Sequence, residues 1–249
     1  MPRSHASLRR LYVGDPLAQG GELTLERKAS NYLVAVLRMS PGAEFVVFNG
    51  RDGAWLARLA NASKTAASAV LAERIAPQTP QSDLWYGFAP LKGERLDWMV
   101  QRATEMGCGL MQPVITQFTQ ATRPRLDKIE ANIIEAAEQC EVLSVPQVLE
   151  PVALQTLLAG WQKTHGDRAL VFADESSDSA SPLPALEGLR ARPVGLVIGP
   201  EGGFSDAERE TLRQQDFVVP ISLGPRILRA DTAAIAALAT IQAFIGDWR

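Results

Sequence analysis

Apolar and polar residues follow one another in short runs over the first third of the chain, which is typical of β-strands separated by turns. Glycine, proline and asparagine fill the segments between these runs, and one helix-like stretch over residues 30–37 interrupts them. The pattern predicts a small β-barrel over residues 1–75. Its strands are expected at residues 11–13, 45–48, 55–59 and 69–71.

Beyond residues 76–82, a polar segment that contains two prolines, strand-like and helix-like segments alternate. We interpret residues 76–82 as a linker between two domains. Strands are predicted at residues 84–89, 110–115, 169–173, 195–198 and 217–221, and helices at residues 94–106, 128–140 and 232–245. The alternation predicts an α/β domain over residues 83–249, in which helices cover both faces of a mostly parallel sheet.

Two of the helix-like segments carry additional signals. Ser205-Asp206-Ala207-Glu208 is a capping box, which predicts a helix that begins directly after a Gly-Gly turn. The helix expected at residues 232–245 is apolar on nearly every side, so it should be buried or pack against a partner subunit.

The composition excludes several classes of protein. Hydrophobic residues make up 46% of the chain and charged residues 21%, as in ordinary globular proteins. We find neither an apolar run of the roughly 18 residues that a membrane span needs nor the apolar core of a signal peptide. The only cysteines, Cys108 and Cys140, and histidines, His5 and His165, show no metal-ligand spacing. We therefore expect a cytoplasmic protein that binds neither membranes nor metals.

The charges are distributed unevenly along the chain, although the net charge is only -3. Residues 1–75 hold ten Lys and Arg against six Asp and Glu, whereas the rest holds fifteen against twenty-two. A basic N-terminal domain on an acidic C-terminal one suggests that the N-terminal domain meets an anionic partner. A chance distribution of solvated charges is the alternative.

Two predicted strands end abruptly in glycine and proline, at Gly199-Pro200-Glu201-Gly202-Gly203 and at Leu223-Gly224-Pro225. In open α/β sheets, ligands bind at the carboxyl ends of the strands, and glycine lets a ligand approach the backbone closely. The first turn lacks the lysine of a phosphate loop and the spacing of a dinucleotide loop, and Glu201 would repel a phosphate. S-adenosylmethionine, which has a cationic sulfonium, suits such a site better, and a purely structural turn is the alternative.

Four ordered blocks of the sequence resemble the RsmE family of 16S rRNA methyltransferases, in the SPOUT superfamily. The blocks are Lys92–Gly107, Glu135–Cys140, Ile198–Phe204 and Leu223–Ala233. The resemblance implies a PUA-like, RNA-binding N-terminal barrel and a C-terminal SPOUT domain with a deep trefoil knot, through which two copies form a homodimer. It also implies methylation of N3 of uridine 1498 in 16S rRNA of the small ribosomal subunit, with S-adenosyl-L-methionine as cofactor and S-adenosyl-L-homocysteine as product.

The same resemblance assigns candidate site residues. Three loops at strand ends would hold the cofactor through Phe172, Ala173, Ile198, Gly199, Pro200, Gly202, Gly203, Leu223, Gly224, Ile227, Leu228 and Thr232. Arg229 would stabilise the developing uridine anion, and Asp231 or Glu201 would assist proton removal. Asp231 departs from the family, which usually has glutamate there, so its role is open. Arg9, Arg10 and Arg38 are the candidates for contacts with RNA phosphates.

Three other functions are compatible with parts of this pattern. A knotted methyltransferase could act on another rRNA or tRNA nucleotide, since the sequence alone does not define the target. A non-catalytic RNA-binding assembly factor would keep the fold, but the intact glycine turns argue against it. The missing G-x-G-x-x-G argues against a nicotinamide-dependent dehydrogenase.

Overall fold

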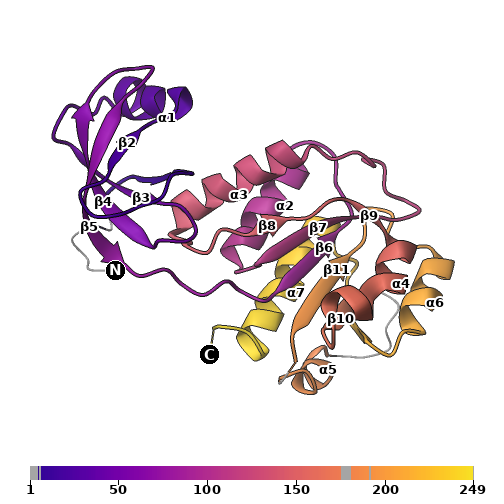
Figure 1. Ribbon diagram of the computed structural model, residues 1–249. Coiled ribbons are helices and arrows are strands. Elements are labelled where there is room, and N and C mark those ends of the chain that lie inside the picture. The colour runs from indigo at the N-terminus through magenta and orange to yellow at the C-terminus, as the bar shows by residue number, and fades with distance from the viewer. Residues whose placement is uncertain (1–4, 6, 175–180, 191, 249) are drawn as a thin grey trace. The chain divides into compact units, whose positions relative to one another are not determined.

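The computed structural model describes residues 5, 7–174, 181–190 and 192–248, and the chain divides into two units, each with its own core (Figure 1). The first unit comprises Met1–Gln81 and Ile134–Val145, and the second comprises Ser82–Ile133 and Pro146–Arg249. Residues 134–145 join the first unit because Ala137 and Leu143 are buried in a cluster with apolar side chains of its sheet.

The first unit is built on a five-stranded mixed sheet in the order β1-β3-β4-β5-β2. The strands are β1 (Arg10–Tyr12), β2 (Glu22–Thr24), β3 (Glu44–Phe48), β4 (Ala54–Asn61) and β5 (Ser68–Ala76). Strands β1 and β3 pair in parallel, and the other pairs are antiparallel. A short helix, α1 (Arg27–Asn31), continues as one π-helical turn, η2 (Tyr32–Val36), and buries Leu33 against this sheet.

The second unit contains a parallel sheet in the order β12-β10-β11-β6-β7-β8. The strands are β6 (Trp85–Phe88), β7 (Leu110–Ile115), β8 (Gln147–Val148), β10 (Ala169–Ala173), β11 (Val194–Ile198) and β12 (Val218–Ile221), and β9 (Val152–Ala153) pairs with β7. The central strands are apolar throughout because both of their faces are buried.

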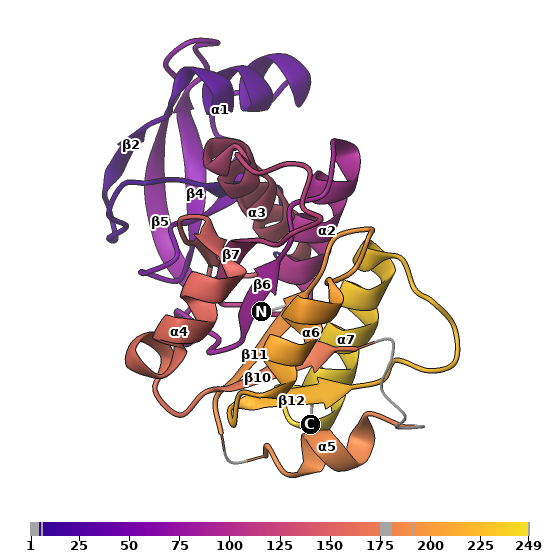
Figure 2. The same cartoon turned by 90° about the vertical axis from the view of Figure 1, so that its right-hand side faces the viewer.

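Helices cover both faces of this sheet, which confirms the predicted α/β class (Figure 2). The helices of this unit are α2 (Glu94–Glu105), α4 (Leu154–His165), α5 (Leu183–Glu187), α6 (Asp206–Arg213) and α7 (Ala230–Phe244). Helix α3 (Leu126–Cys140) begins in this unit, and its residues from Ile134 on belong to the first unit. Helices α2 and α7 pack against each other, and α7 also contacts β11. On the other face, α4 and α6 bury Trp161 and Leu212 in one cluster with Trp85 of β6. None of the described helices is both long and apolar enough to cross a membrane.

Helix α4 was absent from the sequence-based prediction, although its signal is present. Leu154, Leu157, Leu158 and Trp161 are spaced as one face of a helix, and all four are buried. The Trp161 ring stacks on Phe217, with 5.7 Å between the ring centroids. The capping box at residues 205–208 forms as predicted, because the Ser205 hydroxyl accepts from the Glu208 N–H and the Glu208 carboxylate accepts from the Ser205 N–H.

Candidate cofactor site

A pocket opens in the second unit at the carboxyl ends of β10 and β11 and beside the segment that follows β12. These strands are parallel neighbours, so their carboxyl ends meet at one edge of the sheet. The pocket is lined by Phe172, Ala173, Asp174, Ile198, Gly199, Pro200, Glu201, Gly203, Phe204, Arg209, Leu223, Gly224, Arg226, Ile227, Leu228, Ala230 and Ala233.

Glycines shape the two turns of this pocket. Gly203 and Gly224 have φ angles of 68° and 99°, which side-chain-bearing residues rarely adopt. A Cβ on Gly199 would lie 3.0 Å from the Phe204 ring, so the absence of a side chain lets that ring lie against the turn. No heavy atom of the described residues lies within 4 Å of a Cβ placed on Gly224, so the backbone there is open to a ligand.

The structure brings most of the predicted cofactor residues together in this pocket, and two of them, Gly202 and Thr232, lie outside its lining. Gly202 does not line the pocket, because its free side faces Phe118, whose Cβ would lie 3.3 Å from an added Cβ. Thr232 is exposed on the first turn of α7 and also lies outside the lining. The predicted cofactor loop over residues 172–175 ends at Glu175, which lies outside the described residues.

Of the charged residues that line the pocket, the sequence-based assignment gave no role to Arg209. Asp174, which belongs to the predicted cofactor loop of residues 172–175, directly follows β10, and its buried carboxylate accepts from Arg213 Nε at 2.9 Å. Arg209 lies one turn into α6 and donates from Nε to the Phe204 carbonyl at 3.1 Å. The sequence contains a signal for Arg209, because the capping box fixes where α6 begins and therefore which of its side chains lie next to the turn.

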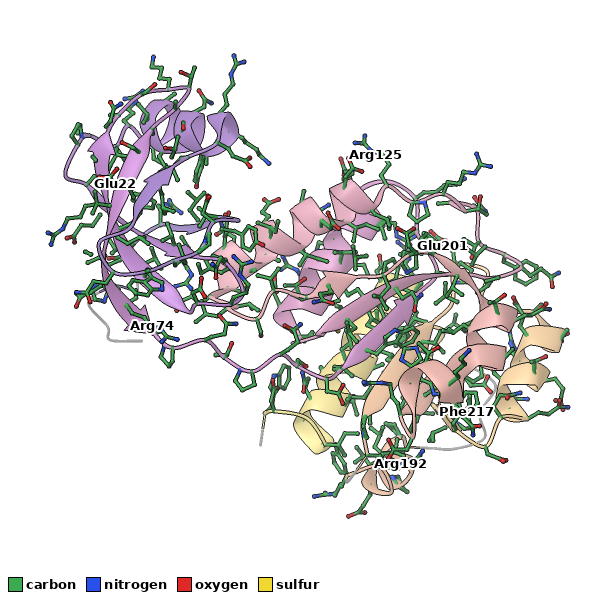
Figure 3. The ribbon with its side chains drawn as sticks, in the orientation of Figure 1. Glu22, Arg74, Arg125, Arg192, Glu201 and Phe217 are labelled. Atoms are coloured by element: carbon green, nitrogen blue, oxygen red, sulfur yellow. The ribbon has the colours of Figure 1, made fainter. Side chains whose placement is uncertain are left out.

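The two carboxylates predicted to assist proton removal share one cation, Arg95 of α2. Arg95 Nε donates to Asp231 Oδ2 at 3.0 Å, and its Nη1 donates to Glu201 Oε1 at 3.0 Å. Glu201, labelled in Figure 3, lies on the turn after β11, and Asp231 lies in the first turn of α7. Sequence reasoning assigned Arg95 no role, because it is 106 and 136 residues from its partners.

The ion pair makes Asp231 a poor proton acceptor. Its hydrogen bond from Arg95 is the main reason why the pKa of Asp231 is lowered, and the same bond raises the pKa of Arg95. The Asp231 side chain is 18% exposed and lies outside the pocket lining, whereas Glu201 is 43% exposed and lines the pocket. The surroundings of the two carboxylates therefore favour Glu201 for contact with a substrate.

Arg229 lies at the edge of this site. It is the N-cap residue of α7, with an extended backbone, and it is exposed. Its chain neighbours Leu228 and Ala230 both line the pocket, but Arg229 itself does not.

The three arginines predicted to contact RNA have different environments in the first unit. Arg9 and Arg38 are exposed. Arg10 is buried, with its guanidinium 5.4 Å from the centroid of the Phe48 ring and 4.0 Å from Glu141. Its burial corrects the prediction, since a buried guanidinium is not accessible to a phosphate. Among the described residues, no group of three or more His, Cys, Asp or Glu side chains is placed to hold a metal ion.

Family models match both parts of the chain. The model of an RNA methyltransferase domain matches residues 77–242, and that of an RNA methyltransferase PUA domain matches residues 25–72. The ribosomal RNA small subunit methyltransferase E of Rickettsia conorii is 30% identical over 94% of both chains. That of Bacillus subtilis is 30% identical over 85% of this chain and 86% of its own.

Solved structures with the same fold contain the predicted cofactor. A methyltransferase from Legionella pneumophila in complex with S-adenosylmethionine has a TM-score of 0.81 at 30% identity, and the match covers 96% of this chain and 98% of that one. Methyltransferase E from Neisseria gonorrhoeae, bound to S-adenosylmethionine, has a TM-score of 0.80 at 26% identity, covering 97% and 100%.

The parallel sheet, the pocket at its strand ends and the matched domains define the protein as an RNA methyltransferase with a PUA domain. Both matched domains were expected from the sequence blocks and the β-rich N-terminal pattern. The chain belongs to the ribosomal RNA small subunit methyltransferase E family, RsmE, which confirms the resemblance seen in the sequence.

Proposed function

We propose that this protein transfers a methyl group from S-adenosylmethionine to N3 of uridine 1498 in 16S rRNA of the small ribosomal subunit. The observation that carries the proposal is the pocket between the turns at residues 199–203 and 223–228, in a chain of the RsmE family. We also propose that the protein acts in the cytoplasm, because its proposed substrate is ribosomal RNA.

The residues of the pocket fit S-adenosylmethionine. Phe172, Ile198 and Leu223 supply an apolar surface of the kind that holds an adenine ring. The exposed backbone at Gly224 can form hydrogen bonds with the polar edge of that ring. The amino-acid end of the cofactor carries an ammonium and a carboxylate group. The pocket lining offers charges of the opposite sign to both, namely the carboxylates of Asp174 and Glu201 and the guanidinium of Arg226. When bound, the cofactor supplies an electrophilic methyl group on its sulfonium.

The chain's own residues must make uridine N3 nucleophilic, because this nitrogen carries a proton. In our proposal Glu201 accepts that proton, since it lines the pocket and is more exposed than Asp231. Arg229 stabilises the negative charge that develops on the neighbouring carbonyl oxygens, for which a planar guanidinium with several donors is suited. Its position between two lining residues supports this role.

The first unit would orient the RNA through Arg9 and Arg38, which are exposed and basic. The target uridine would leave its stack to reach the pocket. The PUA match over residues 25–72 supports an RNA-binding role for this unit.

The second unit would also form the homodimer. Trp98 on α2 is 45% exposed and Trp248, after α7, is 53% exposed, so two large aromatic side chains lie on the surface of this unit. Light scattering after gel filtration tests the assembly: we expect a dimer for the wild-type protein and a monomer for Trp98→Asp. A monomeric wild-type protein would contradict the proposal.

The reaction is tested on ribosomal subunits from a strain that lacks the gene. Purified protein and labelled S-adenosylmethionine should modify these 30S subunits, and mass spectrometry of 16S rRNA should locate one methyl group on N3 of uridine 1498. A methyl group on another nucleotide would identify a different target. Cofactor binding without any transfer would support the assembly-factor alternative.

A further inference from the structure

Arg95 connects three segments that are far apart in the sequence. Its side chain leaves the first turn of α2 and donates to Glu201, on the turn after β11, and to Asp231, at the start of α7. Each of the two bonds is 3.0 Å long. Arg95 Nη2 is buried and has no hydrogen-bond partner among the described residues, so the guanidinium is enclosed on that side.

Each of the two carboxylates held by Arg95 is attached to a different segment that lines the pocket, and we call these two segments its walls. Glu201 is part of the turn at residues 199–203, which forms one wall. Asp231 lies three residues after the lining segment of residues 223–228, and its chain neighbour Ala230 is itself part of the lining. Both walls are irregular segments, so no strand pairing fixes the distance between them.

We propose that Arg95 is a positioning residue: by holding Glu201 and Asp231 on one guanidinium, it fixes the spacing of the two walls and thereby sets the affinity for S-adenosylmethionine. The proposal rests on the cofactor assignment made above. In this proposal Asp231 has a structural role, because its bond to Arg95 holds the segment of residues 223–228 in place. The bond between Arg95 and Glu201 fixes the position of Glu201 in the pocket.

The chemistry of arginine suits this task better than that of lysine. A guanidinium presents its donors in a fixed plane, so two carboxylates that bind different nitrogens are also fixed relative to each other. A lysine ammonium can pair with either carboxylate but imposes no such geometry. Single ion pairs at partly exposed positions contribute little to folding stability, so we expect the larger effect of Arg95 in ligand affinity.

The test is a calorimetric titration of the full-length protein with S-adenosylmethionine, which needs no RNA. Arg95→Ala should raise the Kd about tenfold, and Arg95→Lys should recover part of that loss. Asp231→Asn should raise the Kd in the wild-type background but add little to Arg95→Ala, because residues that act as one unit are not additive. The matched control is Arg125→Ala, which removes a surface ion pair to Asp127 in the same unit and should leave the Kd unchanged.

The outcomes separate this inference from the proposed function. If the wild-type protein does not bind S-adenosylmethionine, both fall. If Arg95→Ala binds like the wild type, or if the effects of Arg95→Ala and Asp231→Asn simply add, the positioning role alone is wrong. Thermal unfolding shows whether each variant is folded. If Arg95→Ala is not folded, the Kd of Arg95→Lys is compared with that of the wild type instead.

Discussion

Glu201 and Asp231 show how one shared cation gives two carboxylates different chemistry. Both accept a hydrogen bond from Arg95, but Asp231 is the more buried, and its pKa is lowered by that bond. A carboxylate with a lowered pKa holds its negative charge more firmly and is a weaker base. For the basicity of a carboxylate, its ion pairs and its exposure matter more than whether the residue is Asp or Glu.

Asp231→Asn should reduce stability in a way that depends on pH. The folded-state pKa of Asp231 is lowered, so its stabilising contribution is complete above the ordinary pKa of about 4 and is lost as the pH falls through the lower folded value. At pH 7 we expect a loss of at most about 1 kcal/mol in the free energy of unfolding, as for other partly exposed ion pairs. Urea titrations at several pH values measure it, and a difference between variant and wild type that grows towards acid pH would contradict the assignment.

Arg229→Ala should slow methyl transfer without weakening cofactor binding. Removing one charge-stabilising donor typically costs about 10²-fold in kcat, and Arg229 does not line the cofactor pocket. Methylation of 30S subunits gives kcat, and calorimetry gives the cofactor Kd. Arg192→Ala is the control, since the hydrogen bonds of the Arg192 side chain among the described residues go to the Asp167 carbonyl. A wild-type rate for Arg229→Ala would exclude the cationic role.

At the scale of elements, local patterns located most helices and strands. The predicted bounds of β7 and β10 coincide with the structure, because both are apolar runs between clear turn signals. Strand β2 was missed because its three residues hold a single apolar side chain, Leu23. Helix α4 was missed despite its periodic apolar face.

The capping box of α6 provides a test at this scale, since α6 begins directly after the turn at residues 199–203. Ser205→Ala removes the acceptor for the Glu208 N–H and should lower the free energy of unfolding by about 1 kcal/mol. Thr211→Ala, in the same helix, removes only a hydroxyl that donates to the Ala207 carbonyl and should be nearly neutral. Equal losses in urea unfolding would mean that the capping box contributes nothing specific.

At the scale of the whole molecule, the division of labour between the two units is the main proposal. The described basic side chains that we assign to RNA, Arg9 and Arg38, belong to the first unit, and the described pocket residues belong to the second. The sequence analysis assigned the two features to the same two parts of the chain. It did not show that residues 134–145 complete the first unit, because their apolar face looks the same whichever core it joins.

The combined variant Arg9→Ala/Arg38→Ala should weaken RNA binding and leave cofactor binding intact. Loss of two phosphate contacts should reduce the slope of log K against log salt by about 1.4–1.8. Filter binding to 16S rRNA fragments over a range of salt concentrations measures that slope. Lys64→Ala is the control for charge alone, and an unchanged slope in the double variant would remove these arginines from the interface.

The sequence by itself determined the α/β class, most elements, the two glycine turns and the family, because these depend on local periodicity, turn chemistry and ordered motifs. The tertiary structure decided the strand order β12-β10-β11-β6, the burial of Arg10 and the contact of Arg95 with Glu201 and Asp231. Periodicity shows which side of an element is apolar but not which other element it meets. Contacts across 106 and 136 residues form only when the sheet and its helices pack, and in this protein those contacts connect α2 to the turn after β11 and to the first turn of α7.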